Sequence, residues 1–220
     1  MIRRHVEARG GKAAIEAIDS VEMDLSIVEP AFTVTGLYRA DRKGRMRVDI
    51  FAAGKRVFSE AYDGRNGWQL REDATRPVPS EKGTAALRNS AQMPTKFLGL
   101  HEMERRGHRL EPAGRERVDG VLYHVVVLTL AGGQSERYYL DPETFLIARS
   151  RAHKPLHPDI DPTPTTIESV YSDFRPVAGV LFAFQAVDTD LTTGKVLQTS
   201  TILDVRPNRP AAEALFGLTP

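Results

Sequence analysis

The residues in this sequence best suited to chemistry lie together in one proline-rich stretch, residues 153–164. It contains four side chains that could bind a divalent metal ion: His153, His157, Asp159 and Asp161. Imidazole nitrogens and carboxylate oxygens together suit zinc or a similar ion. The prolines between them exclude a helix, however, so the spacing matches no helical zinc motif. We therefore prefer a solvated polar loop and keep a metal-dependent enzyme as a weaker alternative.

The remaining histidines form no recognisable catalytic arrangement. His101 and His108 flank a charged stretch at residues 102–106, which is more typical of a helix end than of an acid–base pair. His124 lies within the apolar run 122–130, where a single histidine usually has a structural role. The sequence contains no cysteine and no nucleophile elbow, phosphate-binding loop or dinucleotide fingerprint. It therefore favours a protein that is not an enzyme and needs no cofactor.

The charge balance and the apolar runs argue against two further classes. The chain has 220 residues, with 30 lysines and arginines against 29 aspartates and glutamates. Nucleic-acid-binding proteins usually have a clear basic excess, so we expect no nucleic-acid partner. No apolar run approaches the length of about 20 residues that spans a membrane. The chain begins almost inside a helical pattern, which predicts that an export signal has been removed and that Met1 is an added start.

A meander at residues 114–151 organises the rest of the chain. Its three apolar runs are separated by Gly132-Gly133 and by a turn at residues 141–144, connections so short that they permit only antiparallel pairing. Alternating polar and apolar residues predict further strands before and after it. Residues 122–128 are apolar at both alternating positions. We therefore expect this strand to be covered on both sides, by the barrel interior and by a helix or loop.

Helical patterns interrupt the predicted strands at two places. Residues 1–18 predict two helical segments separated by Gly10-Gly11, and residues 80–106 predict a helical insertion with Ser80 as its cap. We count about ten or eleven strands in consecutive hairpins. So long a sheet with one apolar face must curl and cover that face. The sequence therefore predicts a single mainly β (α+β) domain over residues 1–220, a barrel or a strongly curved antiparallel sheet covered by helices.

Aromatic and aliphatic residues on these elements suggest an internal cavity. A curved sheet of this many strands encloses more volume than a small core fills, and large antiparallel barrels often hold an apolar ligand. In this interpretation residues 80–106 act as a lid. The alternative is that most of these side chains form ordinary sheet core. The candidate cavity residues are Phe32, Val34, Tyr38, Met46, Val48, Trp68, Leu87, Phe97, Leu98, Tyr123, Tyr138, Phe182 and Phe184.

A series of short motifs, mostly turns, runs through most of the chain. They are Gly10-Gly11-Lys12, residues 36–47, Tyr62-Asp63-Gly64 with Trp68, Gly114-x-Glu116-x-Val118-Asp119-Gly120, Tyr139-Leu140-Asp141-Pro142-x-Thr144, Tyr171-x-Asp173-Phe174-x-x-Val177-x-Gly179 and Leu215-Phe216. In this order they resemble the bacterial outer-membrane lipoprotein-sorting proteins, the LolA/LolB-like superfamily. The resemblance implies an incomplete antiparallel β-barrel closed by helices, located in the periplasm, which binds acyl chains in an apolar cavity without catalysis.

The resemblance also implies a residue that controls the lid. Carriers of this family have a basic residue in an Arg-Pro step after the second strand, tied to opening and closing of the lid. Arg42 matches this position most nearly, although Lys43 stands where proline would be and Arg45 and Arg47 are further candidates. The N-terminal cysteine of the membrane-anchored acceptors is absent from this sequence.

These observations predict a monomeric periplasmic carrier or chaperone for lipid or lipoprotein acyl chains, with a membrane protein as a further partner. Burial would supply the affinity, since each buried CH₂ contributes about 0.8 kcal/mol. The main alternative is an interaction or sensor domain that uses the same scaffold with a filled core, because a fold does not fix a function.

Overall fold

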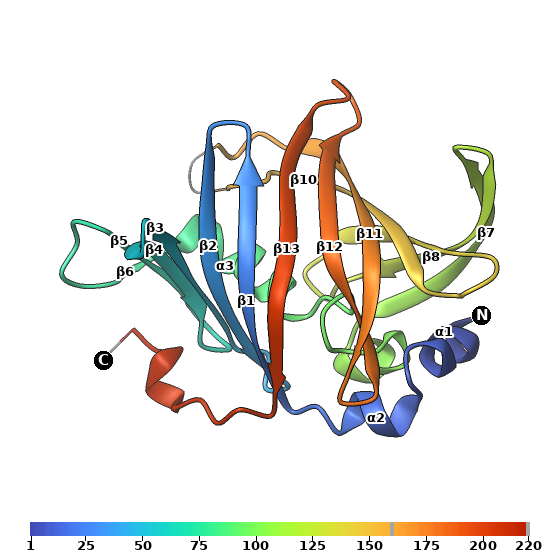
Figure 1. Cartoon of the computed structure of the whole chain (residues 1–220), viewed down its shortest axis with the longest axis horizontal. Helices are drawn as coiled ribbons and strands as arrows, with labels where there is room; N and C mark the ends of the chain where they lie inside the picture. The colour runs from blue at the N-terminus through green and yellow to red at the C-terminus, as the bar shows by residue number, and fades with distance from the viewer. Residues whose placement is uncertain (159–160, 219–220) are drawn as a thin grey trace.

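A computed structural model of the chain describes residues 1–158 and 161–218, and the side chains of all of these except residues 81 and 82. Within them, thirteen strands form one antiparallel sheet (Figure 1). The strands are β1 (Ser20–Glu29), β2 (Phe32–Asp41), β3 (Met46–Ala52), β4 (Lys55–Tyr62), β5 (Gly67–Arg71), β6 (Val78–Pro79), β7 (Arg109–Val118), β8 (Val121–Thr129), β9 (Ser135–Leu140), β10 (Ile147–Lys154), β11 (Thr165–Val177), β12 (Val180–Asp190) and β13 (Val196–Pro207). Their order is β6-β5-β4-β3-β2-β1-β13-β12-β11-β10-β9-β8-β7, so β6 and β7 form two open edges and the barrel is incomplete, as expected.

The chain between the two edge strands crosses one face of the sheet. It contains α3 (Glu81–Ala91), η1 (Leu100–Glu102) and η2 (Glu104–Arg106), and Figure 1 shows α3 behind β1 and β2. Its apolar side chains join those of the strands in the main core cluster. We call residues 80–106 the lid segment, the face that it covers the concave face, and the opposite side of the sheet the convex face.

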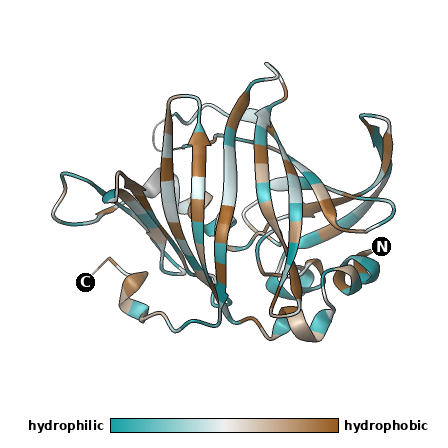
Figure 2. Ribbon diagram, viewed as in Figure 1, coloured by the Kyte–Doolittle hydropathy of each residue, from teal (hydrophilic) through white to brown (hydrophobic). Residues whose placement is uncertain are grey.

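The alternating residues of the central strands divide cleanly between these two faces. On β1, Val21 and Met23 are buried in the core cluster on the concave face, whereas Glu22 and Asp24, which alternate with them, lie on the convex face. Successive strand residues point to opposite faces, so this alternation fixes the register of each hairpin. Figure 2 shows the resulting bands of apolar and polar residues along the strands.

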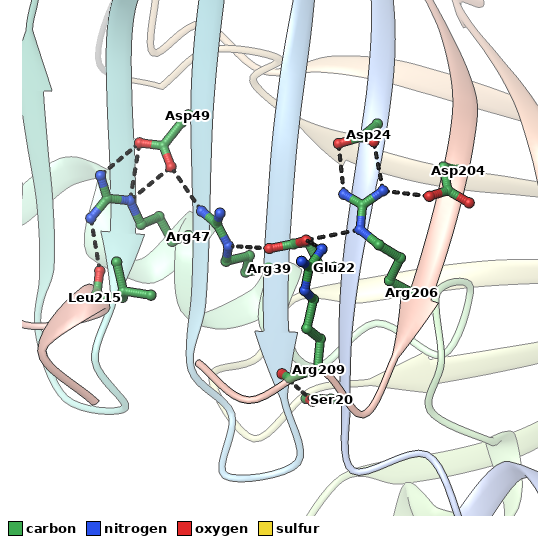
Figure 3. Close-up of polar contacts among 10 residues, drawn as sticks. All are labelled: Ser20, Glu22, Asp24, Arg39, Arg47, Asp49, Asp204, Arg206, Arg209 and Leu215. Carbon is green, nitrogen blue, oxygen red and sulfur yellow. Dashed lines mark hydrogen bonds and ion pairs between the residues drawn. The ribbon is translucent and has the colours of Figure 1, made fainter. Parts of the chain in front are cut away.

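Paired charges cover the convex face of β3, β2, β1 and β13 (Figure 3). Arg39 Nε donates to Glu22 Oε2 over 2.7 Å, and Arg206 Nε donates to Glu22 Oε1 over 2.9 Å. Arg47 binds Asp49 through both Nε and Nη2. Each partly exposed pair contributes little stability alone, but the row keeps this face hydrophilic and in register.

Two short helices, α1 (Ile2–Ala8) and α2 (Lys12–Glu16), precede the sheet, as predicted, although the second ends earlier than residue 18. Gly10 separates them with a φ of +119°, and a Cβ there would lie 1.9 Å from the Gly179 carbonyl oxygen. Only glycine permits this approach between the helices and the β11–β12 turn. The buried His5 fixes α1 through a 2.8 Å hydrogen bond from Nδ1 to the Phe145 carbonyl. No helix in the described residues is long and apolar enough to cross a membrane.

The predicted count of ten or eleven strands was too low because both edge strands were missed. β6 has only two residues, and β7 contains Pro112 and Gly114 among charged side chains. A proline is tolerated at a sheet edge because its missing N–H faces solvent, and the register of β7 against β8 shifts between Pro112 and Arg115. Polar, bulged edge strands discourage pairing with other chains, and for the same reason they lack the alternation of a covered strand.

Two further expectations about local structure were wrong. Residues 94–106 form turns and two 3₁₀ segments rather than a helix, because Pro94, Gly99 and Gly107 interrupt the backbone pattern. Residues 122–128 are largely buried from both sides, but among the described residues the second cover comes from strands rather than from a helix or loop. On the convex face Tyr123 and Val125 form a small cluster with Val118, Tyr139 and Ala148. Neighbouring strands therefore supply this cover themselves.

The C-terminal segment, residues 208–218, lies on the convex face and contains the 3₁₀ turn η3 (Glu213–Leu215). Phe216 is buried, and its carbonyl accepts a 2.8 Å hydrogen bond from Trp68 Nε1, the indole of the single tryptophan. Lys43 and Arg45 bind Glu213 on the exposed side of the segment.

Replacing Phe216 with alanine is expected to detach this segment and to lower the free energy of unfolding by about 3 kcal/mol, as for other buried Phe→Ala changes. Tryptophan fluorescence would report the detachment as a red shift, since Trp68 would lose its cover. Glu213→Ala is the matched control, because it removes only exposed ion pairs and should leave the emission unchanged. An unshifted spectrum in Phe216→Ala would contradict the role given to this contact.

Candidate functional site: a lid held over the concave face

The concave face consists of an apolar half and a more polar half. In the apolar half the strands contribute Met23, Tyr38, Met46 and Phe182, among others, to the main core cluster. The lid segment fills this surface with fully buried side chains, namely Phe97, Leu98, Leu100 and Met103. The lid thus occupies the space in which the sequence predicts an apolar ligand.

The structure brings most of the predicted cavity residues together. Eight lie in the main core cluster: Tyr38, Met46, Leu87, Phe97, Leu98, Tyr138, Phe182 and Phe184. Val48 is partly buried against that cluster, and Val34 is partly exposed farther along β2. Phe32, at the β1–β2 turn, is 47 % exposed. Trp68 and Tyr123 lie on the convex face, where Trp68 contacts the C-terminal segment and Tyr123 belongs to the second cluster.

Arg42 connects the lid to the sheet and to α2. Its Nη1 donates to Glu102 Oε1 over 2.6 Å, its Nε donates to the Ile18 carbonyl over 2.6 Å, and its Nη2 donates to the Ile15 carbonyl. The Glu102 side chain is fully buried. Arg45 and Arg47, the alternative candidates, bind Asp41 and Asp49 instead. Among the three arginines, and within the described residues, only Arg42 forms an ion pair with the lid.

Glu102 is the centre of a compact charged cluster. Besides Arg42, it contacts Arg105 at 2.9 Å and Arg106 at 3.7 Å. Its ligand atoms also lie within 4.8 Å of those of Glu16 and His101, the one such group of potential metal ligands among the described residues. Three guanidinium groups already balance the two carboxylates, so the local field opposes a further cation. We interpret the cluster as a closed ion-pair network.

A second arginine, which the sequence analysis missed, fixes the middle of the lid. Arg9 is buried, and its guanidinium donates to three lid carbonyls: those of Pro94, Lys96 and Leu98, at 2.9, 2.9 and 2.8 Å. Burial lowers the pKa of Arg9 to about 10. The only sequence signal was its position next to the Gly10-Gly11 break, because its partners lie about 85 residues away along the chain.

The candidate metal ligands in the proline-rich loop are not assembled among the described residues. His157 Nε2 lies 2.8 Å from Glu29 Oε1, and His153 contacts Thr166 Oγ1 at 3.3 Å. Asp161 accepts a hydrogen bond from the Thr163 backbone. Asp159 lies outside the described residues. The His157–Glu29 contact instead fastens this loop to the end of β1.

A groove of about 470 Å³ lies at the ends of β1 and β2, beneath the C-terminal segment. Arg42, Lys43, Arg45 and Arg209 line it together with Glu22 and several other residues. Arg209 and Arg45 are paired with Glu22 and Asp41, respectively. The charges that line the groove therefore largely neutralise one another. The groove also borders Arg42, which connects the lid to the sheet.

Comparison with known proteins finds the fold in solved structures. No model of a known protein family matches the chain, and no curated protein matches its sequence. A LolA superfamily protein from Nitrosomonas europaea is similar over 98% of this chain and 95% of its own, with 14% identity and a TM-score of 0.62. A DUF1329 family protein from Desulfovibrio piger is similar over 97% and 94%, with 12% identity and a TM-score of 0.63.

A third similar structure is a domain assigned to outer membrane lipoprotein sorting, from Vibrio parahaemolyticus. It is similar over 98% of this chain and 97% of its own, with 12% identity and a TM-score of 0.57. Identities this low carry information about the fold alone. The chain has the fold of the LolA-like lipoprotein-sorting proteins, as the order of its sequence motifs predicts.

Proposed function

We propose that this protein is a periplasmic carrier that holds the acyl chains of a lipid or lipoprotein between its concave sheet face and its lid, without a catalytic step. One observation carries the proposal. The apolar half of the concave face is covered by a segment of turns and 3₁₀ segments rather than by a second sheet. Such a cover can leave without breaking any strand pairing, so its side chains can be exchanged for an apolar ligand.

The contacts of the lid suggest how the exchange proceeds. Arg9 holds the middle of the lid by hydrogen bonds, and Arg42 holds its C-terminal end by an ion pair. When these contacts release, the sites of Phe97 and Leu98 become available to an acyl chain. Each CH₂ of that chain would gain about 0.8 kcal/mol on burial, which offsets the loss of the lid's own packing.

The solved structures support this proposal through their fold. Two of the three are described as a LolA superfamily protein and a lipoprotein-sorting domain, and both align along nearly the whole chain. A carrier of this kind would work in the periplasm, receive its cargo from a membrane protein and act as a monomer.

The test combines native mass spectrometry of gently purified protein with binding of a fluorescent acyl probe. Ala186 and Val187 are adjacent, partly exposed residues of β12, of which Ala186 shares the concave face with Phe182 and Phe184. Ala186→Trp should block the concave face beside Tyr171, its cross-strand neighbour, and weaken probe binding by about tenfold or more.

Val187→Trp is the matched control, since it adds the same bulk to the convex face and should leave binding unchanged. Equal binding by both variants would contradict a concave site. A protein that carries no lipid and binds no acyl probe would instead favour an interaction or sensor domain, a reading that the filled apolar half also supports.

A further inference from the structure

The polar half of the concave face gathers ionisable side chains from several elements. Lys154 of β10 lies 3.9 Å from Glu136 of β9, and Asp188 of β12 accepts a 2.6 Å hydrogen bond from Ser169. Residues an even number of positions apart on a strand lie on the same face. Glu136 therefore shares the concave face with Tyr138, and Asp188 shares it with Phe182 and Phe184. A charge at this depth requires a reason, because burial without a partner is costly.

Lys96 brings a further positive charge to the concave face from the lid, next to Tyr38 of the apolar half. Its Nζ lies 3.8 Å from the centroid of the Tyr38 ring and donates to Ser90 Oγ over 3.2 Å. In the part of the chain that the structure describes, it forms no ion pair. An ammonium group has three N–H donors, so one hydroxyl and one aromatic face leave it under-coordinated.

The neighbouring charges do not supply the missing partner. Lys154 opposes the positive charge of Lys96, whereas Glu60 on β4 favours it from a distance. Glu136 forms its ion pair with Lys154. Burial raises the pKa of Asp188, which disfavours its charged carboxylate form. Burial, with the charge of Lys154, lowers the pKa of Lys96 to about 7. The concave face thus contains a poorly compensated cation, Lys96, that an incoming anion would stabilise.

We infer that Lys96 binds the carboxylate of a long-chain fatty acid whose hydrocarbon chain takes the place of the lid side chains in the apolar half, and that the positive charge of Lys154 on the same concave face assists this binding. The inference rests on the proposed acyl-binding function and specifies its ligand. A carboxylate hydrogen-bonded to a charged amine is a strong, charge-assisted pair in a site removed from water. Because the Lys96 carbonyl is one of the three that Arg9 holds, the anion would act on the same segment that must move.

Calorimetric titration with three probes tests this assignment: dodecanoate, dodecanol and acetate. Dodecanoate should bind at least about tenfold more tightly than dodecanol, and acetate should bind weakly or undetectably. Lys96→Met should remove the preference for the acid while dodecanol still binds. Lys96→Arg should retain most of it, and Lys154→Met should reduce it. Lys55→Met, which alters a lysine paired with the exposed Glu72, serves as the matched control.

Each other outcome overturns the inference in a recognisable way. Equal binding of acid and alcohol by the unchanged protein would refute the carboxylate site and leave the carrier function standing. So would an acid preference that persists in Lys96→Met, with melting curves confirming that the variant is folded. Acetate that binds as tightly as dodecanoate would assign the lysines to small anions. Failure of both long-chain probes would contradict the carrier function itself.

Discussion

Replacing Glu102 with alanine is expected to lower the free energy of unfolding by about 3–5 kcal/mol. Its carboxylate is fully buried and contacts three guanidinium groups, those of Arg42, Arg105 and Arg106. Without it, the largely buried Arg42 and Arg106 would face each other without their carboxylate, whereas the exposed Arg105 would keep Glu16 as a partner. Arg42 would also lose the 2.6 Å contact that ties the lid to the end of β2. The lid should therefore open more readily, and an acyl probe should enter faster.

Chemical denaturation and probe-binding kinetics would measure both effects. Glu104→Ala is the matched control, because Glu104 lies two residues away on the exposed side of the same segment. Its removal should change the free energy of unfolding by less than about 0.5 kcal/mol. If the two variants lost similar stability, the three arginines would have to be compensated by another group, and the proposed connection of lid to sheet would be wrong.

Local signals in the sequence were sufficient for the hairpins but not for the sheet edges. Alternation and turn residues locate most strands because each hairpin is a local structure whose two strands are adjacent in the chain. β7 was not predicted, because it contains Pro112, Gly114 and several charged residues. These residues are common in edge strands and rare in strands with neighbours on both sides. The lid was predicted as an insertion, but its second part was predicted as a helix, although Pro94, Gly99 and Gly107 break it into turns and 3₁₀ segments.

The site shows the same division between local and long-range information. Alternation indicates that Tyr38 and Trp68 belong to strand faces, yet it cannot tell which face becomes concave when both carry aromatics. Arg42 was found through the family resemblance, and the structure supplies its partner, Glu102. Arg9 and Lys96 were missed because their environments are assembled from segments far apart in the chain. No spacing rule within a single segment encodes such contacts.

Replacing Lys96 with methionine is expected to stabilise the folded protein at neutral pH, by about 2–3 kcal/mol. Burial lowers the pKa of this lysine from 10.5 to about 7. Below about pH 7, Lys96 is protonated in both the folded and the unfolded state, so burial of its charge lowers the free energy of unfolding by the full amount. Between about pH 7 and pH 10.5 the unfolded state binds more protons than the folded state, so the free energy of unfolding of the unchanged protein rises with pH. The rise ends once Lys96 is neutral in both states. The expected gain in stability is smaller than the full pKa difference implies, because a long lysine side chain can partly relax toward water.

Denaturation of the two proteins at about pH 6 and about pH 9.5 would test this, because the advantage of the methionine variant should be largest at the lower pH and shrink at the higher one. Lys55→Met should show neither effect, since Lys55 forms only an exposed pair with Glu72. A methionine variant less stable than the unchanged protein at the lower pH would mean that Lys96 is well compensated. Lys96 would then lower the stability of the empty protein while it selects the ligand. Such a trade-off between stability and function is common at binding sites. The stability and ligand-binding measurements on Lys96→Met together decide whether this residue serves the fold or the cargo.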